Sequence, residues 1–169
     1  NTNLKTLDSF APNNKVTNFL IAENFINLKN HDSAIDRYER CLALGYKPDV
    51  VLFFNLGSAY FFTQQNEPAI KYLNKGIELD SNYYPLYNNL AWASLDSNPS
   101  YSCKLFQKAY LKNMTNSVNI NNLGYSHLRC NNLDTALKYF NLSMRIDSSN
   151  SFVYRNIGLY HMNKGNKAE

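Results

Sequence analysis

The chain has 169 residues, of which 44% are hydrophobic and 18% are charged, and its formal net charge is +4 at pH 7. This composition is that of an ordinary globular protein long enough to bury a core, and it excludes a disordered chain. The Lys and Arg residues form no dense run, and no apolar stretch approaches the length of a membrane span. We therefore expect neither nucleic-acid binding nor membrane insertion.

The three cysteines, Cys41, Cys103 and Cys130, are widely spaced, with no CxxC pair and no His at metal-ligand spacing. Neither a disulfide framework nor a zinc site is expected, and no other cofactor motif is present. Free thiols favour a reducing compartment, so we predict a cytoplasmic location. Residence outside the cytoplasm after removal of a signal peptide stays the alternative, because buried free cysteines also occur there.

In chain order, residues 1–14 are expected to be an extension or the end of a preceding repeat. Helix–turn–helix units then follow at about 15–49, 50–83, 84–116 and 117–150, with a partial unit at 151–169. The second unit illustrates the pattern, because its apolar residues have helical spacing. One face comprises Phe53, Leu56, Ala59 and Tyr60, and the other comprises Ala69, Ile70, Leu73 and Ile77.

A small residue repeats with a period of about 34. The separations are 35, 34, 33 and 34 along the series Ala22, Gly57, Ala91, Gly124 and Gly158. Glycine within a helix costs up to about 1 kcal/mol relative to alanine, so its use predicts that a second helix approaches closely. A further small residue follows after twelve positions in most units, but Ser102 comes one position early, which predicts a shortened turn in the third unit.

The stretches Asn55–Asn82 and Asn122–Asn150 resemble tetratricopeptide repeats, and the resemblance extends from Lys15 to Glu169. It implies an all-α fold, a right-handed superhelix (α-solenoid) of stacked helix–turn–helix units whose first helices line a concave binding face. The third unit departs most from the pattern. Because the chain begins at Asn1 and ends where a second helix should begin, we expect a processed chain or a fragment of a longer repeat protein.

One asparagine recurs two positions before the small residue. It is present in four of the five units, with Leu20 replacing it in the first, as Asn55, Asn89, Asn122 and Asn156. The resemblance puts these side chains on the concave face, like the asparagine ladder with which some family members hold an extended peptide. A carboxamide can pair with both a backbone N–H and a backbone C=O. Asparagine is common in this chain, with 27 of the residues. The alternative is therefore that these four asparagines recur by composition alone and are solvated polar residues that bind no ligand.

Other positions of the same register are candidates for the groove. They are Asn88, Asn121, Phe62, Trp92, Tyr125, Arg129 and Arg155. Trp92 is either an exposed anchor for a ligand or packs against a neighbouring repeat. The charges, Glu23 near the start and Arg129 and Arg155 near the end, predict a preference for an acidic side chain or terminal carboxylate. The carboxylate clamp known in the family is not expected, because Phe19 and Glu23 occupy its first positions.

No nucleotide-binding, hydrolase or metalloprotease motif is present, so we do not expect an enzyme. The predicted function is that of a protein–protein interaction scaffold which binds an extended peptide or partner segment with micromolar affinity. The partner is a protein or peptide whose identity the sequence does not name. The alternatives are a regulatory or substrate-recruiting segment of a larger enzyme, and a structural module that forms homo-oligomers.

Overall fold

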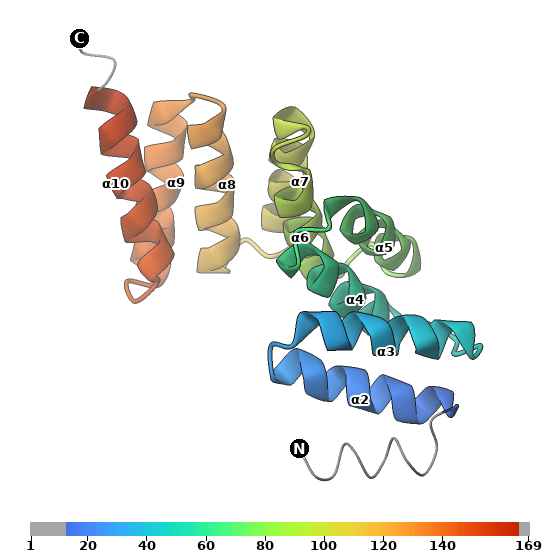
Figure 1. The fold of residues 1–169 in the computed structure, drawn as a ribbon. Coiled ribbons are helices and arrows are strands. Elements are labelled where there is room, and N and C mark those ends of the chain that lie inside the picture. Colours follow the sequence, from blue (N-terminus) through green and yellow to red (C-terminus); the bar gives the residue numbers. More distant parts are fainter. Residues whose placement is uncertain (1–12, 166–169) are drawn as a thin grey trace. The chain divides into compact units, whose positions relative to one another are not determined.

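The computed structural model describes residues 13–165, and these residues form nine helices and no strand (Figure 1). The helices are α2 (Lys15–Asn27), α3 (His31–Ala43), α4 (Val50–Phe62), α5 (Asn66–Leu79), α6 (Tyr84–Ser94), α7 (Pro99–Lys112), α8 (Ser117–Arg129), α9 (Leu133–Ile146) and α10 (Ser151–Gly165). The all-α prediction is confirmed. The expected N-terminal extension lies outside the described residues except for Asn13 and Asn14.

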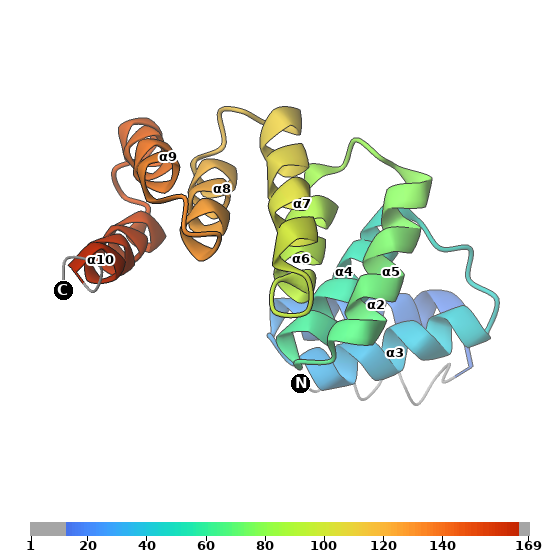
Figure 2. The ribbon, with the colours of Figure 1, turned by 90° about the horizontal axis from the view of Figure 1, so that it is seen from above.

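The contacts divide the chain into two compact units, which we call the N-terminal unit (up to Asn89) and the C-terminal unit (from Leu90). In the N-terminal unit α2 packs on α3, α4 packs on α5, and α3 packs on α4. In the C-terminal unit α7 packs on α8, α8 packs on α9, and α10 packs on both α8 and α9. Figures 1 and 2 both show α8, α9 and α10 side by side.

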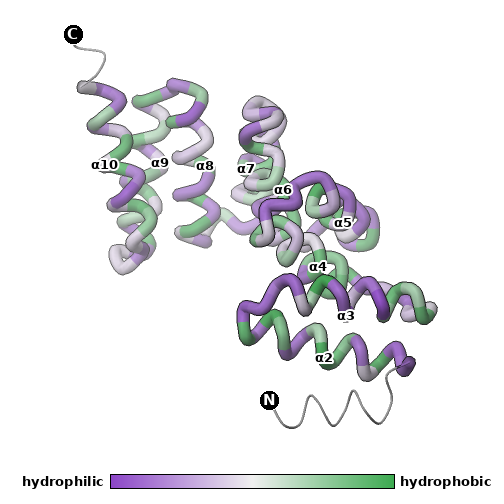
Figure 3. Tube along the Cα trace, in the orientation of Figure 1, coloured by the Kyte–Doolittle hydropathy of each residue, from purple (hydrophilic) through white to green (hydrophobic). Residues whose placement is uncertain are grey.

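The core is built from the predicted apolar faces. Phe53, Leu56, Ala59 and Tyr60 of α4 are buried, as are Ala69 and Leu73 of α5. In the C-terminal unit a buried cluster joins Leu128, Ala136, Phe140, Val153 and Tyr160. The tube in Figure 3 accordingly changes between hydrophobic and hydrophilic along the helices. The second helices α3, α5 and α9 bury a narrow stripe, whereas the first helices α4 and α8 bury residues around much of their circumference.

The predicted close approach at the small residues is confirmed for two glycines. A Cβ atom on Gly57 would lie 2.7 Å from Leu73 Cγ, and one on Gly124 would lie 2.8 Å from the Phe140 ring. A Cβ on Gly158 of α10 would meet nothing within 4 Å among the described residues. The glycine is therefore needed sterically where a second helix packs against the first.

Three connections within helix pairs have the same backbone signature. Lys29, Gln64 and Asn131 have φ values of 56°, 62° and 62°, and each is the middle residue of a three-residue connection. The prediction of a shortened turn in the third unit is wrong. It is α6 that is short, with 11 residues against 13 in α4 and α8, and four residues separate it from α7. Pro99 disfavours a helical conformation at Asn98, and Asn98 instead caps α7 by accepting a hydrogen bond from the Tyr101 N–H.

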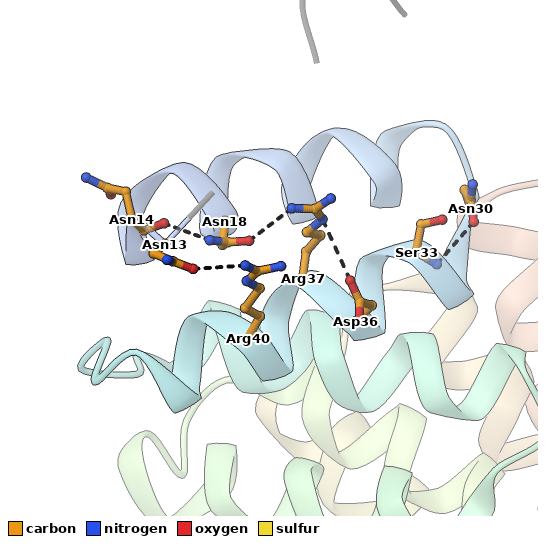
Figure 4. A network of polar contacts seen from close by, with 8 residues as sticks. All are labelled: Asn13, Asn14, Asn18, Asn30, Ser33, Asp36, Arg37 and Arg40. Carbon is orange, nitrogen blue, oxygen red and sulfur yellow. Dashed lines mark hydrogen bonds and ion pairs between the residues drawn. The ribbon is translucent and has the colours of Figure 1, made fainter. Parts of the chain in front are cut away.

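Many of the asparagines cap helices. The side chains of Asn14, Asn30, Asn98 and Asn116 accept backbone N–H groups in the first turn of α2, α3, α7 and α8. Such caps stabilise a helix by about 1 kcal/mol each. Figure 4 shows how this chemistry extends between α2 and α3, where Arg37 donates to the fully buried Asn18 and Arg40 donates to Asn13. Part of the asparagine content is therefore structural.

Candidate functional site

A hollow of about 210 Å³ opens in the C-terminal unit. Helices α6, α8 and α10 supply its lining, which consists of Trp92, Val118, Asn121, Asn122, Phe152 and Arg155. The spacing explains the convergence, because positions 118, 121 and 122 share one face of α8, and 152 and 155 share one face of α10. Four of the predicted groove residues, Trp92, Asn121, Asn122 and Arg155, therefore meet at one place.

Trp92 forms an aromatic wall of this hollow. Its ring centroid lies 5.2 Å from that of Phe106 on α7 and 5.2 Å from that of Tyr125 on α8. Trp92 therefore packs against the next repeat and also lines the hollow, and its role as an anchor for a ligand stays a prediction. Tyr125 is held in turn by Arg129, whose Nη1 donates to the Tyr125 hydroxyl at 3.3 Å, while Nη2 lies 3.3 Å from Asp96 Oδ1.

The amides that line the hollow are largely buried, and so is a third amide bonded to one of them. Asn121 is 2% exposed, Asn122 is 6% exposed, and Asn156 of α10 is 1% exposed. The Asn156 Nδ2 group donates to Asn121 Oδ1 at 3.0 Å. This bond fixes the orientation of the Asn121 amide and leaves its N–H groups as donors for another acceptor.

The predicted residues of the N-terminal unit have contacts within that unit. Asn55 Nδ2 donates to Glu23 Oε1 at 2.9 Å, and Glu23 also accepts the Tyr38 hydroxyl. Asn89 Nδ2 donates to Ser58 Oγ at 2.6 Å. Asn88 is 9% exposed. Phe62 is 60% exposed and stacks on His31 with 4.8 Å between ring centroids.

Three members of the asparagine row share a role that sequence reasoning missed. Asn55, Asn89 and Asn156 each donate to the first helix of the preceding repeat, at separations of 32, 31 and 35 residues. The acceptors Glu23 and Ser58 both directly follow the small residue of their repeat. The equivalent residue of the third repeat is Trp92, whose indole N–H is a donor only. The asparagine ladder stays a prediction, with an inter-repeat contact as an observed role.

Val118 and Phe152 were also missed, although the sequence carries a signal for them. The position six residues before the small residue is occupied by Val16, Val51, Pro85, Val118 and Phe152. Four of these side chains are exposed to solvent, at 50% for Val16, 40% for Val51, 45% for Val118 and 55% for Phe152. An apolar residue that recurs at every period yet stays outside the core indicates a surface for contacts.

The charges around the hollow differ in their partners. Arg129 is paired with Asp96. Arg155 lies 5.5 Å from the Phe152 ring centroid, and no carboxylate of the described residues lies within ion-pair distance of it.

Within residues 13–165 no three His, Cys, Asp or Glu side chains gather around a metal position. None of the described helices is long and apolar enough to cross a bilayer.

The paired helices and the 34-residue period define a helical-repeat protein. The tetratricopeptide-repeat family model matches residues 51–83 and 119–150. These two stretches are tetratricopeptide repeats, and the resemblance to this family that was recognised in the sequence is confirmed. No curated protein matches the chain in sequence.

Several solved structures share the fold. The TPR protein YrrB, described as having an unusual peptide-binding site, is 16% identical with a TM-score of 0.78, covering 90% of this chain and 80% of that one. MamA from Desulfovibrio magneticus RS-1 is 18% identical with a TM-score of 0.79, and the match covers 88% of this chain and 85% of MamA. The first TPR of Spaghetti (RPAP3), bound to an HSP90 peptide, is 16% identical with a TM-score of 0.64. This match covers 69% of this chain and 94% of that one.

Proposed function

We propose that this chain is a protein-interaction scaffold whose C-terminal unit holds an extended peptide segment in the hollow between α6, α8 and α10. The observation that carries the proposal is the convergence of a tryptophan, two amides and an arginine with no carboxylate partner beside two exposed apolar side chains. Two of the structurally similar TPR proteins are described as binding peptides, which supports the same class of function.

The size of the hollow favours one side chain of a longer ligand. Pockets that enclose small molecules usually measure about 300–1,000 Å³, and this one measures about 210 Å³. The apolar surfaces of Trp92, Val118 and Phe152 accept an apolar side chain. The amides of Asn121 and Asn122 bond the peptide backbone beside it, which contributes affinity with little sequence preference.

Arg155 gives the hollow its preference among peptide sequences. Arg155 lines the hollow and is exposed to solvent, and an acidic side chain or terminal carboxylate next to the bound apolar residue would be its partner. Arg129 is less suited to this task because its charge is already paired with Asp96. The preference for acidic ligands predicted from both arginines is thus assigned here to Arg155.

The peptide-binding test uses Trp92, the single tryptophan, as an internal reporter. Peptides selected from a random display library should shift its fluorescence emission on titration, because the ligand covers the indole. Phe152→Ala should weaken binding about tenfold through lost apolar contact. Arg155→Glu should weaken acidic peptides more than neutral ones. Met162→Ala, at an exposed α10 position outside the hollow, is the matched control and should leave the affinity unchanged.

Two outcomes would contradict the proposal. Peptides that bind with unchanged affinity to Phe152→Ala and Arg155→Glu, and leave the emission unchanged, occupy another surface. A concentration-dependent dimer that dissociates in the Phe152→Ala variant would instead assign the hollow to self-association. Sedimentation equilibrium of the wild type and the variant distinguishes the dimer from peptide capture.

A further inference from the structure

Two of the three cysteines are in contact. Cys103 lies in the first half of α7, and Cys130 follows the end of α8, yet their Sγ atoms are only 3.2 Å apart. All three thiols are free in the structure, with Cys130 exposed and Cys103 half-buried. The third, Cys41, is buried, and its thiol donates to the Lys15 carbonyl oxygen at 3.2 Å.

A small reagent can reach this pair through a second hollow. A cavity of about 410 Å³ is lined by Cys103, Lys104, Gln107, Lys108, Leu123 and His127. Burial lowers the pKa of His127, so this imidazole is neutral at pH 7 and the positive charge of the hollow comes from its two lysines. Cations beside a reactive group raise the local concentration of anionic reagents.

We propose that Cys103 and Cys130 form a reversible dithiol–disulfide pair that is oxidised by a low-molecular-weight disulfide carrying carboxylate groups. Two observations carry this inference independently of the peptide hollow, namely the contact between the sulfur atoms and the cationic cavity that opens on one of them. A disulfide bond is about 2.05 Å long, so the sulfurs need to approach by only about 1 Å. A structural zinc site is the competing use of paired thiols, but no third ligand gathers with them among the described residues.

The chemistry is thiol–disulfide exchange in two steps. The thiolate of the exposed Cys130 attacks one sulfur of the small disulfide, whose S–S bond breaks and releases one small thiolate. The Cys103 thiolate then attacks the Cys130 sulfur of the mixed disulfide, forming the protein disulfide and releasing the second small thiolate. Two protein thiols are oxidised, one small disulfide is reduced to two thiols, and the two thiol protons pass to the two released thiolates.

The pair is poised to react slowly at neutral pH. Although the residue as a whole is exposed, partial desolvation of its thiol, followed by the contact with Cys103, raises the pKa of Cys130 to about 11, and the charge of Arg129 opposes this shift. The other charged or titratable groups near the pair are those of the cavity, Lys104, Lys108 and His127. Because the thiolate is the nucleophile, the exchange rate should rise as the pH increases from 7 to 9.

The test treats the full chain with oxidised glutathione and, in parallel, with the uncharged 2-hydroxyethyl disulfide. Free thiols are counted by alkylation under native conditions, and the products are mapped by mass spectrometry. The wild type and Cys41→Ser should both lose two thiols and contain a Cys103–Cys130 disulfide. Cys103→Ser should stop at a mixed disulfide on Cys130. The double variant Lys104→Gln/Lys108→Gln should react several-fold more slowly with glutathione disulfide but not with the uncharged reagent.

Other results would overturn the inference. If the wild type stopped at the same mixed disulfide as Cys103→Ser, the two sulfurs would not come together in solution. If all three thiols reacted at one common rate, Cys103 and Cys130 would not be a specific reactive pair. The same conclusion would follow if Cys130 formed a disulfide between two chains. An equal rate with both reagents in the lysine double variant and the wild type would refute the role of the charges.

Discussion

Phe140→Ala is expected to lower the free energy of unfolding of the C-terminal unit by about 3–5 kcal/mol, the range typical of a buried phenylalanine. Phe140 lies on α9 and is fully buried, in a cluster with Leu128, Ala136, Val153 and Tyr160. Its ring fills the space beside Gly124, where α8 and α9 leave no space for a Cβ atom. Removing the ring leaves a cavity that a close-packed helix pair can collapse only in part.

Urea denaturation followed by circular dichroism measures this loss. Phe152→Ala is the matched control, because it makes the same substitution in the same unit at a side chain that is 55% exposed. We expect the control to remain within about 0.5 kcal/mol of the wild type. A loss below 1 kcal/mol for Phe140→Ala would mean that contacts between repeats, and not the packing within this helix pair, hold the unit together.

Gly124→Ala and Gly158→Ala are expected to change stability in opposite directions, although the two glycines occupy the same position of consecutive repeats. At Gly124 the new methyl group would lie 2.8 Å from the Phe140 ring and 3.2 Å from the Ala136 carbonyl oxygen. Overpacking of this kind costs about 1–3 kcal/mol. At Gly158 nothing lies within 4 Å, so the higher helix propensity of alanine should stabilise α10 by up to about 1 kcal/mol.

The double variant Gly124→Ala/Phe140→Ala separates steric conflict from other effects. In a background without the ring the methyl group has space, so Gly124→Ala should cost nothing there or become slightly stabilising. Such a coupling energy identifies a direct contact. If Gly124→Ala and Gly158→Ala had equal effects in the wild type, the close approach of α8 and α9 would not be the reason for the glycine.

The fold was predictable because helical repeats make their contacts over short distances in sequence. The spacing of Phe53, Leu56, Leu73 and their equivalents identified the buried faces, and the glycine period identified the close helix pairs. The turn of the third repeat was misread, because a missing residue in the period does not say whether a helix or its connection is shorter. Pro99 and the Asn98 cap determine where α7 begins, and α6 has already ended at Ser94.

The candidate site was predictable in part for the same reason. The register of the repeat placed Trp92, Asn121, Asn122 and Arg155 among the groove candidates, and these four line one hollow. It did not reveal that amides of the asparagine row donate to the preceding repeat, as Asn55 does to Glu23. The sequence does not tell in which direction an asparagine amide points, because the neighbouring helix determines which group it meets.

The sequence by itself determined the period, the helix pairs and the buried stripes, because each follows from the spacing of residues along one or two helices. Tertiary structure alone decided which chemically reactive groups meet across repeats. Cys103 and Cys130 are 27 positions apart, without a recognisable motif, and their sulfurs come into contact because α7 packs on α8. Trp92 of α6 and Tyr125 of α8, 33 positions apart, also meet across repeats. Contacts between side chains on separate helices depend on how the helices are rotated and spaced, and a linear pattern does not contain that geometry.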